Sequence, residues 1–120
     1  MYKYKNMNPY NRNIEDCVIR SLSLLTGRSW DETYRELAYY ASLDGYMTDN
    51  VEFVEDYLDD RYIRECHYSK TAGEFAEEHP FGKYAVTMNG HITAIIDGVI
   101  YDTFNPAKRI MRCAWKIKRG

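Results

Sequence analysis

The sequence predicts an α+β fold in which N-terminal helices pack on a C-terminal antiparallel β-meander. Before Pro80, apolar residues recur every three or four positions, whereas after it they form short runs typical of strands. Asn89-Gly90 and Asp97-Gly98 lie between these runs and are typical of tight hairpin turns. A chain of 120 residues fits one domain, 1–120, with a helical part at about 13–80 and a sheet at about 82–118.

The first predicted helix runs from about residue 15 to 26. Asn13 is its expected N-cap, acidic residues occupy its first turn, and Gly27 ends it. Cys17 therefore lies in the first turn of this helix.

Three further helical segments follow. Ser29 caps the second, with Glu32 at the capping-box position. The third begins at Thr48, and "SKTAGEFAEEHP" predicts a short fourth helix that Pro80 stops. A short strand is expected at about 62–65, before this fourth helix.

The predicted sheet consists of "KYAVTM", "HITAII", "VIYDTF" and "RIMRCAWKIK". If both turns contain two residues, Met88 faces His91 and Thr93 faces Asp102. One face then holds His91 and Asp102 as diagonal neighbours, within reach of a side-chain contact. The other members of that face are Tyr84, Val86, Met88, Thr93, Ile95, Ile100 and Phe104.

The predicted His91–Asp102 pair has two interpretations. It is either a buried polar pair near the edge of the sheet, or a catalytic base whose tautomer and orientation the carboxylate fixes. Asp97 is expected only to form a turn.

Cys17 is the candidate nucleophile because the partial positive charge of a helix N-terminus favours a thiolate. Glu15 and Asp16 oppose this effect unless they point away. The alternative is a small apolar residue that packs the helix on the sheet. Cys66, Cys113, His67 and His79 lack a comparable setting, and structural roles are expected for them.

A hydrolase would also need donors for a developing oxyanion. The Cys17 backbone N–H is one candidate, and the side-chain amide of Asn11 or Asn13 is the other. Both asparagines also fit turn-forming or capping roles.

Composition limits the function classes. A net charge of −2 provides no overall field for nucleic acid, and no apolar run approaches the roughly 18 residues that cross a bilayer. The polar start resembles no signal peptide, and three cysteines without a CxxC pair argue against a disulfide framework. We therefore expect a cytoplasmic protein without a metal or other cofactor.

The stretch "EDCVIRSLSLLTGRSWDETYRELA" resembles the opening of a family of small phage and bacterial proteins with a DCVxRA…GHxTAxxDGVIYDT pattern. "GHITAIIDGVIYDTFNP", followed by "RIMRCAWKI", resembles the closing part of the same family. The resemblance extends from about residue 13 to 117 and is weakest between 45 and 80.

That family looks like minimal papain-like cysteine hydrolases, similar in layout to bacteriocin-processing peptidases and Josephin-type deubiquitinases. The resemblance implies a Cys17–His91–Asp102 catalytic triad and, for a phage-encoded protein, the host cytoplasm. Asn11 stands where papain-like enzymes usually have a glutamine. The short chain also leaves little room for an elaborate substrate groove.

The expected function is hydrolysis of a peptide or isopeptide bond through a thioester, with a protein or peptide as substrate. Glutamine deamidation or acyl transfer would use the same triad. A non-catalytic module that binds a host protein is the other alternative, because the chain has twelve tyrosines, four of them at Tyr34, Tyr39, Tyr40 and Tyr46.

Overall fold

The computed structural model describes residues 1–117, which form four helices and one six-stranded mixed sheet, so the α+β class is confirmed. The helices are α1 (Cys17–Thr26), α2 (Trp30–Leu43), α3 (Val51–Asp59) and α4 (Ala72–Glu78). The strands are β1 (Tyr2–Tyr4), β2 (Arg64–Cys66), β3 (Lys83–Met88), β4 (His91–Ile96), β5 (Val99–Asp102) and β6 (Met111–Ile117).

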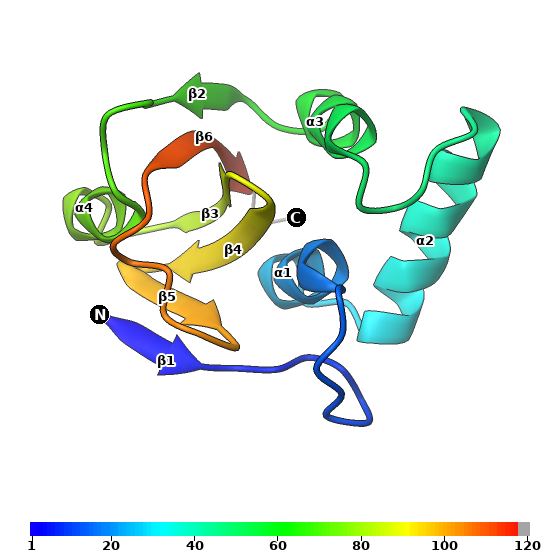
Figure 1. Ribbon diagram of the computed structural model, residues 1–120, viewed down its shortest axis with the longest axis horizontal. Coiled ribbons are helices and arrows are strands. Elements are labelled where there is room, and N and C mark those ends of the chain that lie inside the picture. The colour runs from blue at the N-terminus through cyan, green and yellow to red at the C-terminus, as the bar shows by residue number, and fades with distance from the viewer. Residues whose placement is uncertain (118–120) are drawn as a thin grey trace.

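The sheet is covered on both faces. Figure 1 shows α1, α2 and α3 to one side of the strands and α4 to the other. The larger apolar core joins the first three helices to the sheet through residues such as Leu22, Leu37 and Trp115. The smaller core packs Phe75 of α4 against Ile95 and its neighbours. The two faces of β4 thus serve different cores, as the alternation of its side chains requires.

The start of α1 differs from the prediction. The helix begins at Cys17, preceded by Asp16, which makes no side-chain cap hydrogen bond. Asn13 is not the cap. The first turn contains no acidic residue because Glu15 and Asp16 both precede the helix, and the Asp16 carboxylate pairs with Arg20. Gly27 ends the helix as expected, at a φ of 76° that favours glycine.

The other three helices begin at residues whose side chains cap them. Ser29 forms the predicted capping box at the start of α2, and Thr71 forms another at the start of α4. Asn50 caps α3, so this helix begins later than the predicted Thr48. The α4 helix ends before Pro80, as expected.

The sheet is not a simple antiparallel meander. Its strand order is β1-β5-β4-β3-β6-β2, and β1 pairs in parallel with β5. The meander prediction holds for β3, β4 and β5, but β6 lies beside β3, and both edge strands come from outside residues 82–118. The three-residue β1, with sequence YKY, has too little alternation to reveal a strand. Residue 118, where the predicted sheet ended, lies outside the described residues.

The predicted turn register is confirmed where the ladders extend. Met88 pairs with His91 across the first turn, and Ile95 pairs with Ile100 across the second. Asp97 and Gly98 both have positive φ, at 49° and 77°, as a tight two-residue hairpin turn of the primed type requires.

Cys66 and Cys113 form a disulfide, contrary to the expectation from their number and spacing. They are paired residues of β2 and β6, so the antiparallel ladder brings together two side chains 47 positions apart. Spacing along the chain could not reveal this pairing. In sequence, α4 and strands β3 to β5 separate β2 from β6, and only the folded sheet makes the two strands neighbours.

Candidate active site

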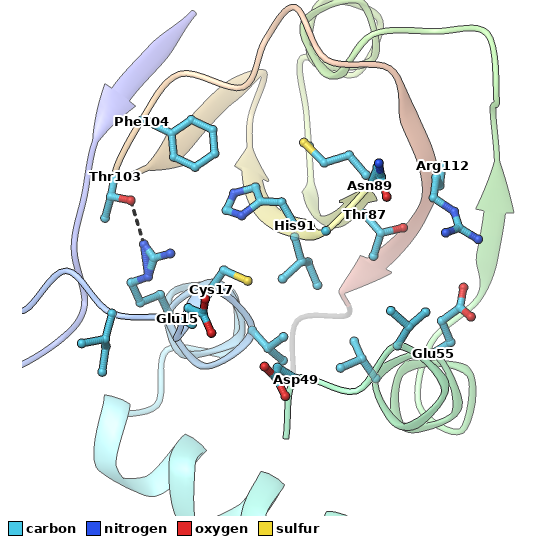
Figure 2. A pocket seen from close by; sticks show the side chains of 18 of the residues that line it. Glu15, Cys17, Asp49, Glu55, Thr87, Asn89, His91, Thr103, Phe104 and Arg112 are labelled. Carbon is cyan, nitrogen blue, oxygen red and sulfur yellow. Dashed lines mark hydrogen bonds between the residues drawn. The ribbon is translucent and has the colours of Figure 1, made fainter. Parts of the chain in front are cut away.

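A pocket of about 550 Å³ opens where the N-terminus of α1 meets the end of the sheet. Its walls come from the start of α1, from α3, from the β3–β4 turn and from the segment after β5. Figure 2 shows Cys17, His91 and Phe104 together on one side of it, with Arg112 and Glu55 on the other. The pocket thus combines the candidate nucleophile and base with room for a ligand.

Cys17 is the first residue of α1 and is the free cysteine of the described chain. It is half-buried and lines the pocket. Val18 and Ile19 behind it are buried in the larger core and fix this end of the helix. The thiol is therefore held at the partly positive end of a helix.

His91 is the first residue of β4 and lines the pocket. Its Nε2 lies 2.6 Å from Oδ2 of Asp102, and the two side chains are 7% and 4% exposed. The ring also packs against Phe104, with centroids 4.7 Å apart. Because Asp102 occupies Nε2, Nδ1 is the ring nitrogen left for Cys17. Figure 2 shows the imidazole above Cys17.

Burial alone would lower the pKa of His91. The hydrogen bond to Asp102, the contact with the Cys17 thiol and the charges of both partners outweigh burial and raise the pKa from 6.5 to about 9. Burial conversely favours the neutral form of Asp102, but the hydrogen bond from His91, the charge of His91 and the hydrogen bond from the Thr103 N–H lower its pKa. The pair is therefore an imidazolium and a carboxylate at neutral pH.

Arg20 and Thr103 complete the surroundings of Asp102. The Thr103 N–H donates to Oδ1 of Asp102 at 2.7 Å. Nη1 of Arg20 lies 3.8 Å from the same oxygen and donates to the Thr103 hydroxyl at 3.0 Å, the bond drawn at Thr103 in Figure 2. One oxygen of the carboxylate thus faces α1, while the other faces His91.

Sequence reasoning missed this arginine. It lies on α1 three residues after Cys17, and its Nε is 2.8 Å from Oδ1 of Asp16. The signal was present, because Asp16 and Arg20 have the i, i+4 spacing of a helical ion pair. That spacing is common on helix surfaces, so it could not indicate that both side chains are buried.

The two acidic residues before Cys17 differ. Asp16 is buried, and its carboxylate pairs with Arg20. Glu15 is exposed and lines the pocket. The Asp16 carboxylate is thus taken up by Arg20, whereas Glu15 remains at the pocket.

The two asparagines predicted to stabilise an oxyanion lie in different places. Asn13 lines the pocket, close to the start of α1. Asn11 instead lies in an exposed turn at a φ of 52°, where its Oδ1 accepts from Asn6 at 3.4 Å. The structure brings Asn13 to the pocket and leaves Asn11 in a turn-forming role.

The other predicted non-catalytic residues lie elsewhere. Cys66 and Cys113 are joined in the disulfide, and the Nε2 atoms of His67 and His79 are each 3.6 Å from Oε1 of Glu65. Within residues 1–117, no group of three or more His, Cys, Asp or Glu side chains has an arrangement that could hold a metal ion. In the same residues, no helix is both long and apolar enough to span a membrane.

Comparison of the chain with protein-family models, with curated proteins and with solved structures gives no match.

Proposed function

We propose that the protein is a cysteine hydrolase that cleaves a peptide or isopeptide bond through a thioester. One observation carries the proposal: a free cysteine at a helix N-terminus shares a pocket with a histidine that a buried carboxylate holds at 2.6 Å. A structural polar pair would need neither the adjacent thiol nor a pocket of about 550 Å³.

In the first step, Cys17 attacks as the thiolate of a Cys17–His91 ion pair, in which its proton already resides on Nδ1 of His91 and Asp102 stabilises the imidazolium. The sulfur attacks the carbonyl carbon, a C–S bond forms, and the carbonyl electrons move to oxygen. When the oxyanion collapses, the C–N bond breaks, and the leaving amine takes the proton from His91.

In the second step, the now neutral His91 takes a proton from water as that water attacks the thioester. The C–S bond breaks, the carboxylic acid leaves, and Cys17 and His91 return to their starting state. The raised pKa of His91 suits its role as proton donor to the amine at neutral pH.

The start of α1 supports stabilisation of the oxyanion. Asp16 makes no side-chain cap bond to this helix, so that carboxylate does not occupy the first N–H groups. The Cys17 N–H is the nearest of these groups to the reacting sulfur, and Asn13 is the side-chain amide at the same wall.

The proposal is tested by digesting a library of peptides and lysine isopeptides with the wild type and with Cys17→Ala, and by identifying new termini by mass spectrometry. We expect cleavage by the wild type only. Asp102→Asn is expected to reduce the rate by roughly a hundredfold or more, since it perturbs the tautomer of His91.

A substrate-independent readout is the rate at which iodoacetamide alkylates Cys17 between pH 5 and 9. We expect rapid alkylation at pH 6, and its loss in His91→Gln. Alkylation no faster than that of an unstructured cysteine peptide at pH 6, together with equal digestion by wild type and Cys17→Ala, would overturn the proposal.

A further inference from the structure

We infer that Arg20 is a positioning residue of this site, which joins the helix that carries Cys17 to the strand end that carries Asp102. The inference rests on the proposed function and assigns the arrangement of the triad to a side chain outside it. Arg20 touches neither the thiol nor the imidazole in any hydrogen bond or ion pair of residues 1–117.

The guanidinium bridges two elements that are far apart in the chain. Its Nε faces Asp16 on α1 at 2.8 Å. Its Nη1 faces the end of β5, at 3.0 Å from the Thr103 hydroxyl and 3.8 Å from Asp102. The residue is only 9% exposed, so water competes weakly for these contacts.

The helix side of this bridge is itself held in place. Oδ2 of Asp16 accepts from Nε1 of Trp30 at 2.9 Å and from Nδ2 of Asn8 at 3.3 Å. Asp16 immediately precedes Cys17, so fixing its carboxylate fixes the backbone at the start of α1. The bridge therefore determines where Cys17 lies relative to the end of β5.

The contacts at the end of β5 determine which oxygen of Asp102 binds His91. Arg20 and the Thr103 N–H both face Oδ1, which leaves Oδ2 for His91 at 2.6 Å. A planar guanidinium can serve Asp16 with one nitrogen and Thr103 with another, whereas the ammonium of lysine is a single point charge. Lysine would keep the charge but could not face Asp16 and Thr103 with two separate nitrogens.

The chain contains a matched control. Arg35 and Asp31 of α2 have the same i, i+4 spacing, at 3.0 Å, but their side chains are 76% and 65% exposed. Such a surface pair contributes little to stability. Arg35→Lys therefore tests the same substitution without the buried bridge.

The experiment measures iodoacetamide alkylation of Cys17 from pH 5 to 9 in the wild type, Arg20→Lys and Arg35→Lys, with circular dichroism to establish folding. We expect Arg20→Lys to slow alkylation at pH 6 by about tenfold while the fold is retained, because small displacements of paired groups are costly. Arg35→Lys should match the wild type.

Asp102→Asn and the double variant test whether Arg20 acts through Asp102. We expect the double variant to be no slower than Asp102→Asn alone, since the two residues act as one unit. Additive losses would overturn the inference, as would a wild-type rate in folded Arg20→Lys. If Arg20→Lys does not fold, the same alkylation rate is measured in Thr103→Val, which removes the hydroxyl that accepts from Arg20. A wild-type rate in Thr103→Val overturns the inference.

These outcomes are separable from failure of the proposed function. That failure would appear as slow alkylation of Cys17 in the wild type itself. A fast wild type with an equally fast Arg20→Lys leaves the hydrolase proposal intact and removes only the role of Arg20.

Discussion

Two regions of the molecule bring histidine to a carboxylate, with different results. At the pocket, one histidine and one aspartate meet at 2.6 Å, with both side chains at least nine-tenths buried. At the β2 edge of the sheet, His67 and His79 share Glu65, each at 3.6 Å, and about half of the Glu65 side chain is exposed.

The difference lies in what surrounds the carboxylate. The Thr103 N–H and Arg20 hold the second oxygen of Asp102, so its charge is directed at His91. Glu65 lies on a three-residue edge strand, where water can replace either histidine. Burial with complementary donors, more than the residue pair itself, makes a His–carboxylate contact strong.

The largest expected effect is that of Asp102→Ala. The change leaves His91 without its buried partner and removes one of the two carboxylates that face Arg20, so the free energy of unfolding should fall by about 3–5 kcal/mol. Urea denaturation followed by circular dichroism measures it. A loss below about 1 kcal/mol would mean that the buried pair is no more important than the exposed one.

The second effect concerns the β2 edge, which is held covalently. Cys66→Ala/Cys113→Ala removes a disulfide between residues 47 apart and should cost about 2–4 kcal/mol. Denaturation under non-reducing conditions measures this loss. The rate of Cys17 alkylation should remain that of the wild type; a large change would show that the two regions are coupled.

The third effect is a pH dependence that belongs to the pocket alone. The pKa of His91 is raised from 6.5 to about 9, so the protonated pair stabilises the fold fully below pH 6.5. This stabilisation is lost as pH rises through 9, and amounts to at most about 3 kcal/mol. Urea midpoints from pH 6 to 10 should show the decline, and His91→Gln should lack it.

The smallest effect is that of Glu65→Ala, the counterpart of Asp102→Ala. Both of its histidine contacts are long and partly exposed, so the free energy of unfolding should change by less than about 1 kcal/mol. A loss similar to that of Asp102→Ala, measured under the same conditions, would remove the contrast between the two regions.

Much of the fold and of the candidate site follows from local sequence signals. The two-residue turns fix the register of β3, β4 and β5, and this register makes His91 and Asp102 neighbours. Capping at Ser29 and the glycine at position 27 likewise act within a few residues. Hairpin turns and caps involve so few residues that their geometry can be read before the chain is folded.

Tertiary structure alone decided the rest. The contact between Arg20 and Thr103 joins residues 83 positions apart, and the disulfide and the parallel β1–β5 pair also depend on distant segments meeting. A helical arginine reads the same in sequence whether it is exposed, like Arg35, or buried, like Arg20. Sequence determined the partners within the hairpins, while packing of α1 against the sheet decided which charges lost their water and therefore which contacts became strong.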